Sequence, residues 1–187
     1  MIDNLIANLQ KNGFEVSHFS TNEEVTQKIY ELIPEGSQVM TMSSVTLDEL
    51  GVSKQINESG KYDAVKPKLY SGESTAICAA SMPQFAIGSV QAITESGELL
   101  SVSATGSQIP AYVYGAKKVI FVVSTKKIVT DLNSALKRIS DVVAPLEDQR
   151  ALKAYGVHTS INKILLYNKE HIAGRTHVIL LDQPIGY

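Results

Sequence analysis

Residues 92–107 read AITESGELLSVSATGS and place a β-hairpin near the middle of the chain. The Ser-Gly pair at 96–97 is a turn signal between two apolar stretches, and beyond it Leu100 and Val102 alternate with serines. The pattern predicts two strands joined by a turn, with Glu95 at the tip, held by the sheet and open to solvent. A carboxylate in this position can serve as a nucleophile or general base, and a solvated turn acid is the alternative.

Strands and helices alternate on both sides of this hairpin. Hydrophobic spacing predicts strands at 14–19, 38–42, 85–87, 118–123, 163–167 and 176–182. It predicts helices at 3–11, 74–81, 109–114 and 131–143, the last ending before Pro145. Two more helices are expected, one that begins with capping residues at 20–24 and runs to 33, and one that begins at Thr46. A β-α-β-α order is typical of a largely parallel sheet covered by helices. We therefore predict an α/β fold, with one three-layer α/β/α domain over residues 1–187 and a mixed, mainly parallel sheet.

Composition restricts the class of protein. The chain has 187 residues, of which 44% are apolar and 19% charged, and this is typical of a globular protein with a sizeable core. Its 17 basic and 19 acidic residues give a net charge of -2, so charge gives no reason to expect nucleic acid as a partner. The N-terminus lacks the pattern of a secretory signal, and the apolar runs are too short for a bilayer. We expect a cytoplasmic protein without a membrane partner.

Several common sites are absent from the sequence. The single cysteine, Cys78, excludes an internal disulfide and a multi-cysteine metal site, and its alanine and isoleucine neighbours suggest a buried thiol. The four histidines show no metal-binding spacing. No dinucleotide fingerprint, phosphate loop or serine-hydrolase elbow occurs. We therefore expect no metal and no cofactor.

Three polar loops are candidates for ligand binding. Ser43, Ser44, Val45 and Thr46 follow a strand and open a helix, an arrangement that suits an anion, with simple helix capping as the alternative. A second loop follows the hairpin, with a simple connecting turn as the alternative. A third follows the apolar strand at 118–123, with a pair of solvated lysines as the alternative. We expect one rim to contain, with the first loop and Glu95, the following residues: Gly88, Ser89, Thr94, Gly97, Thr105, Gly106, Ser107, Gln108, Lys126 and Lys127.

The order of these segments resembles a known family. The segments VQAITESGEL at 90–99, TGSQ at 105–108, YGAKKVI at 114–120 and KIVTDL at 127–132 resemble the lactate-utilization (LUD) domain family, and SVTLDELG at 44–51 and the chain end are also similar to it. The resemblance runs over the whole chain and implies a Rossmann-like fold of the NagB, RpiA and CoA transferase type. In CoA transferases a glutamate at a comparable turn is the nucleophile, and Glu95 is the residue here that resembles it.

The resemblance also implies a role in metabolism. Family members are linked to lactate oxidation, in which partner subunits carry iron–sulfur chemistry. This chain departs from the family pattern at Ser43, Gln91, the pair 107–108 and Lys126, and it lacks the arginine that many members carry after the glycine at 106. The fold is therefore expected to carry over better than the ligand.

Two functions from different classes follow. The first is a protein of organic-acid utilization that binds a small anionic metabolite or acts as an accessory to other proteins of a lactate-oxidation system. The second is an enzyme, similar to an acyl- or CoA-transferase or to a sugar-phosphate isomerase, that uses Glu95. A homodimer is expected because two-fold dimers are the commonest assembly.

Overall fold

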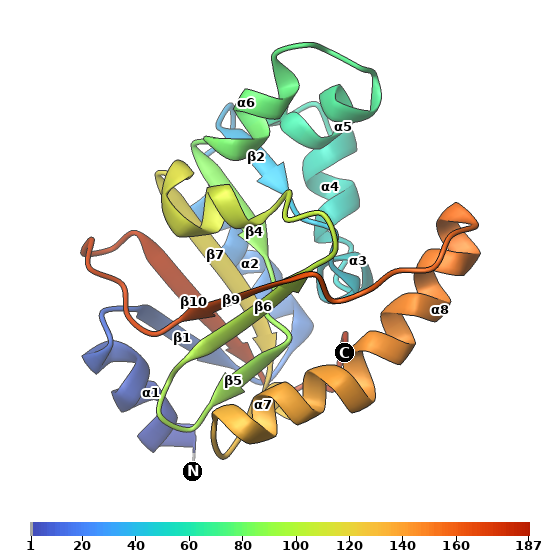
Figure 1. The fold of residues 1–187 in the computed structure, drawn as a ribbon. Helices are drawn as coiled ribbons and strands as arrows, with labels where there is room; N and C mark the ends of the chain where they lie inside the picture. Colours follow the sequence, from blue (N-terminus) through green and yellow to red (C-terminus); the bar gives the residue numbers. More distant parts are fainter. Residues whose placement is uncertain (1) are drawn as a thin grey trace.

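Six parallel strands form the main sheet of the protein, seen in a computed structural model that describes residues 2–187 (Figure 1). Their order across the sheet is β1-β10-β7-β4-β2-β3, and every neighbouring pair is parallel. The strands are β1 (Glu15–Phe19), β2 (Gln38–Thr41), β3 (Asp63–Ala64), β4 (Phe85–Gly88), β7 (Lys118–Ser124) and β10 (Thr176–Leu181). Their carboxyl ends therefore all meet at one edge of the sheet.

The central strands β7 and β10 are buried on both faces. Residues 119–124 of β7 are all buried, as are five of the six residues of β10, and the two strands pair with Thr176 opposite Val119. A parallel strand between two covering layers has no solvated face, so its sequence is a continuous apolar run rather than an alternation. This explains the uninterrupted apolar run at 119–123 of the sequence.

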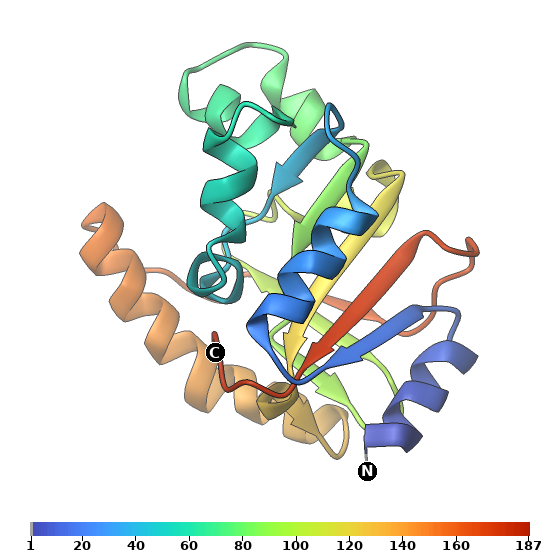
Figure 2. The same ribbon diagram turned by 180° about the vertical axis from the view of Figure 1, so that it is seen from behind.

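Three helices cover one face of this sheet. They are α2 (Asn22–Leu32), α3 (Val45–Glu49) and α4 (Val52–Glu58), and Figure 2 shows α2 lying over the strands. Val25 and Ile29 of α2 pack with Ile120 and Ile179 of the central strands. The predicted capping box begins α2, since Thr21 Oγ1 accepts from the Glu24 N–H at 3.3 Å and a Glu24 oxygen accepts from the Thr21 N–H at 3.1 Å.

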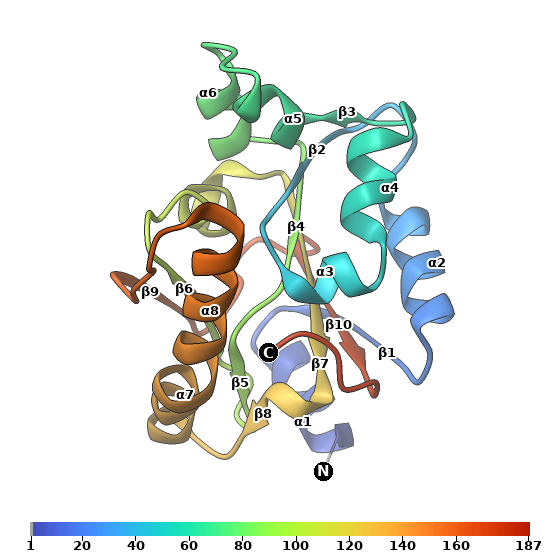
Figure 3. The same cartoon turned by 90° about the vertical axis from the view of Figure 1, so that its right-hand side faces the viewer.

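The opposite face is covered by helices and by a second sheet. The helices are α1 (Ile2–Lys11), α5 (Val65–Tyr70), α6 (Ala76–Ser81) and the π turn η1 (Ala111–Gly115). The second sheet has the order β8-β5-β6-β9, with β8 (Ile128–Val129), β5 (Ala92–Thr94), β6 (Leu99–Ser103) and β9 (Lys163–Tyr167). Figure 3 views the main sheet close to edge-on, with α2 and α4 on one side and the second sheet on the other. The predicted α/β class is confirmed, and the antiparallel hairpin belongs to this separate sheet.

A long helical segment covers the outer face of the second sheet. It consists of α7 (Leu132–Arg138), the π turn η3 (Ile139–Val143) and α8 (Ala144–Tyr155). The prediction that Pro145 stops this helix was wrong. The Ala144 N–H donates five residues back to the Ile139 carbonyl, and this wider turn places Pro145 in the first turn of α8, where proline is tolerated. The helix therefore continues to Tyr155.

Two further expectations need correction. Cys78 is exposed rather than buried, because α6 turns Ala76 and Ala80 toward the core and Ile77 and Cys78 toward solvent. Helix α5 was not predicted, since the sequence around it is rich in polar residues and glycine, and the helix expected from Thr46 is divided into α3 and α4. Gly51, at φ +70°, separates α3 from α4 in a conformation that favours glycine.

The structure of residues 2–187 contains no helix with both the length and the apolar character needed to cross a membrane.

Candidate functional site

A cleft of about 590 Å³ lies at the carboxyl ends of the parallel strands. The segment after β2 (43–46), Ser89 after β4 and Lys127 after β7 line it from the sheet. Its other walls come from α5, from the segment after β6, and from α8 with the residues that follow it. Ligands of open α/β sheets bind at this edge, where strand connections leave toward opposite faces. The position and size of the cleft are those of a small-molecule site.

Lys127 lies at the floor of this cleft. It ends the short 3-10 turn Thr125–Lys127 and has only 2% of its surface exposed. Its ammonium donates to Thr46 Oγ1 at 3.0 Å, to Ser89 Oγ at 3.0 Å and to the Val90 carbonyl at 3.2 Å. These bonds join the ends of three neighbouring strands around one cation.

The acceptors around Lys127 are all neutral. Across residues 2–187, no carboxylate oxygen lies within 4.0 Å of its Nζ. Burial, together with the nearby charges of Arg138 and Lys126, lowers the pKa of Lys127 from 10.5 to about 7, against a smaller opposing effect of Glu49. The floor of the cleft is therefore a buried cationic group without an internal counterion.

Two residues of the loop after β2 have different structural roles. Ser44 Oγ accepts from the Leu47 N–H at 3.4 Å and so caps α3, as the helix-capping alternative expected. Thr46 is buried, and its hydroxyl accepts from the Lys127 ammonium at 3.0 Å. The other two members of this loop, Ser43 and Val45, also line the cleft.

The segment after β6 contributes three of its four predicted residues. Thr105, Ser107 and Gln108 line the cleft. The Gln108 amide also donates to the Val102 carbonyl at 3.1 Å, so it fixes the end of β6. Gly106 does not line the cleft, and at φ +86° it forms the turn there, with the Lys163 side chain packed against it.

Two other predicted residues lie outside the cleft. A Cβ on Gly88 would stand 1.9 Å from Tyr112 Oη, so Gly88 packs against this tyrosine instead of facing a ligand. Lys126 is exposed, and its ammonium donates to the Pro184 carbonyl at 2.9 Å. Of the two adjacent lysines, only Lys127 lines the cleft.

Glu95 occupies the predicted hairpin tip but not the predicted rim. Its side chain is exposed at a separate hollow of about 330 Å³, beside Thr130 and Asp182. The tip is docked on α1, where Asn8 Nδ2 donates to the Glu95 carbonyl at 2.8 Å. The sequence placed Glu95 and Lys127 on one rim, and the structure does not bring them together.

The neighbours of Glu95 at the tip are also structural. Thr94 is buried, and its hydroxyl bonds to the Glu98 carboxylate. Hydrogen bonds from Thr94 and Ser96 lower the pKa of Glu98. Gly97, at φ +88°, packs so closely on α1 that a Cβ would lie 2.9 Å from the Asn12 amide nitrogen. None of these residues lines the cleft.

Several cleft residues were not expected from the sequence. Lys66 comes from α5, Glu147 and Arg150 from α8, and Tyr187 from the segment after β10. Arg150 forms a bidentate salt bridge with Glu147, in which Nε donates to Oε2 at 2.8 Å and Nη2 donates to Oε1 at 2.7 Å. The Tyr187 hydroxyl donates to the same carboxylate. The spacing of Glu147 and Arg150 on a helix could have suggested their pairing, but it gave no sign that the pair faces a cleft.

Comparisons with known proteins agree with this architecture. The family model described as the LUD domain matches residues 2–181. The crystal structure of a DUF162 family protein from Deinococcus radiodurans is similar with a TM-score of 0.60, at 12% identity, over 96% of this chain and 95% of that chain. This structural likeness shows a shared fold, and a comparison with curated proteins gives no match. Since the family model spans almost the entire sequence, this chain belongs to the LUD domain family.

Proposed function

We propose that this protein binds a small anionic metabolite in the cleft at the carboxyl edge of the main sheet. One observation carries the proposal: the buried ammonium of Lys127 faces the cleft, and no carboxylate of residues 2–187 pairs with it. A buried charge without a partner is costly, and proteins retain such groups where they have a function. A carboxylate or phosphate of a ligand would supply the missing counterion.

The surroundings of Lys127 support recognition of a polar ligand. Thr46 and Ser89 hold the ammonium in place. Arg138, whose guanidinium donates to the Gln91 carbonyl at 2.6 Å, adds positive potential at Lys127. The hydroxyls of the segment 105–107 provide further hydrogen-bonding groups on the facing wall. A volume of about 590 Å³ falls in the range of small-molecule sites.

The family suggests the metabolic setting of this binding. Its name refers to lactate utilization, and we propose organic acids as the ligand class and a role in, or accessory to, their utilization. Association with other proteins of a lactate-oxidation system, a cytoplasmic location and a homodimer all remain predictions from the sequence.

An enzyme that uses Glu95 is the second function expected from the sequence. The geometry favours the binding function over it, because the Glu95 side chain lies outside the cleft that contains the buried cation. No hydrogen bond from residues 2–187 orients that carboxylate as a base or nucleophile would require.

A binding experiment with adjacent lysines tests the proposal. Wild type, Lys127→Met and the control Lys126→Met are compared by thermal shift and calorimetry with lactate, valerate, glutarate and 3-phosphoglycerate. We expect at least one of these anions to raise the melting temperature of wild type and of Lys126→Met, because a ligand of the native state stabilises it. Lys127→Met should lose this response. The absence of any response in wild type, or equal responses in both variants, would contradict the proposal.

A further inference from the structure

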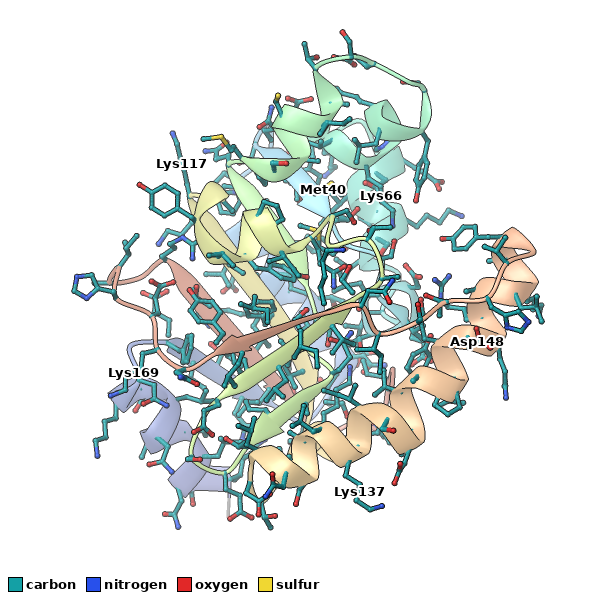
Figure 4. All side chains as sticks on the ribbon, in the orientation of Figure 1. Met40, Lys66, Lys117, Lys137, Asp148 and Lys169 are labelled. Atoms are coloured by element: carbon teal, nitrogen blue, oxygen red, sulfur yellow. The ribbon has the colours of Figure 1, made fainter. Side chains whose placement is uncertain are left out.

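A second cationic group lines the cleft, away from Lys127. Lys66 lies at the start of α5, is half-buried and lines the cleft wall (Figure 4). Across residues 2–187, its Nζ donates no hydrogen bond, and no carboxylate oxygen lies within 4.0 Å of it. Lys68 on the same helix, by contrast, is paired with Asp63. Lys66 is therefore a second lysine of the cleft without an ion pair to a carboxylate of the described residues.

The groups that face Lys66 come from both walls. Asp48 and Tyr155 favour its charge and Arg150 opposes it, while burial is the main influence and lowers its pKa. Arg150 is itself balanced by Glu147 and lies over the Tyr155 ring at 5.4 Å. The Asp48 carboxylate also lines the cleft, but it forms no ion pair with Lys66. Lys66 is thus the cleft cation whose N–H groups donate to no group of residues 2–187.

The two lysines are placed by different strands. Lys127 follows β7 and Lys66 follows β3, and these strands are separated by β4 and β2 in the sheet. Adjacent strands lie about 4.8 Å apart, so the axes of β7 and β3 are about 14 Å apart. The two lysines therefore enter the cleft from different strands of the sheet edge, and no hydrogen bond or ion pair links either of them to a carboxylate of residues 2–187.

We propose that the ligand of this cleft carries two acidic groups joined by a short carbon chain, one bound at Lys127 and the other at Lys66. The proposal rests on the anion-binding function proposed above and specifies its substrate class. Dicarboxylates and phosphorylated carboxylic acids share this chemistry. A hydrogen bond to a charged group contributes about 1.5–3 kcal/mol, so the second acidic group should strengthen binding by about tenfold or more.

Matched ligands and matched lysine variants test this inference. Calorimetry compares glutarate with valerate, which has the same chain length and one carboxylate, and 3-phosphoglycerate with glycerate. We expect wild type to bind one of the dianions about tenfold more tightly than its monoanionic partner. Lys66→Met should lose that preference, Lys66→Arg should recover most of it, and Lys68→Met, which removes a lysine from the same helix, should retain it.

The outcomes separate the two proposals. If wild type binds the monoanion and the dianion of each pair equally, the second acidic position is overturned while anion binding stands. Retention of the preference in Lys66→Met would also overturn it. If wild type binds none of these four anions and lactate also leaves its melting temperature unchanged, anion binding at Lys127 fails together with it. Circular dichroism of each variant verifies that a lost preference does not come from unfolding.

Discussion

The Lys127 ammonium donates a 3.0 Å hydrogen bond to Ser89 Oγ, and this bond joins the turn after β7 to the end of the neighbouring strand β4. A neutral hydroxyl in this position orients the cation without neutralising it. The protein therefore maintains a buried charge at the edge of its main sheet, and the cost of that charge should be measurable in the free protein.

The first prediction concerns stability and pH. The pKa of Lys127 falls from 10.5 in the unfolded chain to about 7 in the fold, so between these values the unfolded state binds more protons and the contribution of Lys127 to stability rises with pH. Below pH 7 the full cost of the buried charge is present. Lys127→Met removes it, and its melting temperature relative to wild type should therefore be higher at pH 6 than at pH 9.

Thermal denaturation of both proteins at the two pH values provides the measurement, with Lys126→Met as the control because that lysine is exposed. Lys127→Met also loses three hydrogen bonds, and this lowers its melting temperature at both pH values. The quantity to compare is therefore the melting temperature of Lys127→Met minus that of wild type, at pH 6 and at pH 9. A difference that stays constant would show that Lys127 does not titrate in this range.

The second prediction concerns anion binding and pH. An anion next to Lys127 favours the ammonium and raises its pKa in the complex, whereas the pKa is about 7 in the free protein. The affinity for glutarate should be constant near pH 6.5 and fall above pH 7, by up to about tenfold per pH unit. Calorimetry at pH 8 in buffers of different ionisation enthalpy should detect proton uptake on binding. Proton release, or an affinity that increases with pH, would argue against Lys127 as the anion ligand.

The third prediction concerns the hairpin tip. Glu95→Gln should leave anion affinity within about twofold of wild type, since the carboxylate is exposed outside the cleft. Its melting temperature should also change little, because a surface substitution without partners alters stability by about 0.5 kcal/mol or less. Thermal shift and calorimetry measure both quantities. A large loss of affinity in Glu95→Gln would contradict this prediction. It would show that the Glu95 carboxylate contributes to the binding site, as the enzymatic hypothesis requires.

The contrast between Glu95 and Lys127 shows what the sequence could predict. Turn and strand signals are local, so the hairpin, its tip and the loops after buried strands were placed correctly. Which of these loops share a cleft depends on how the second sheet packs on the first. The Asn8 contact draws the tip toward α1, and no sequence pattern around residue 95 carries this information.

The same reasoning explains why the far wall of the cleft was missed. Pro145 is a strong local stop signal, but the π turn ending at Val143 moves it into the first turn of α8. The helix then carries Arg150 and Tyr155 to the cleft. Lys66 was missed for a related reason, since the polar sequence around it gave no helix signal and its position depends on the order of the strands.

The fourth prediction concerns the packing beneath the cleft. A Cβ added at Gly88 would stand 1.9 Å from Tyr112 Oη and 3.1 Å from Tyr112 Cζ, so Gly88→Ala should destabilise the fold by about 1–3 kcal/mol. Tyr112 is buried against Phe121, with ring centroids 4.7 Å apart, and this contact prevents it from moving freely. Denaturant unfolding measures the loss.

A double-mutant cycle with Tyr112→Phe tests the cause of this loss. Across residues 2–187, no hydrogen bond engages the Tyr112 hydroxyl, so Tyr112→Phe alone should be nearly neutral. In the double variant the hydroxyl that clashes is absent, and Gly88→Ala should cost at least 1 kcal/mol less than in wild type, a coupling of the size expected for residues in contact. Additive costs would mean that the strain at residue 88 comes from Met42, whose Cβ would lie 3.2 Å away, and not from Tyr112.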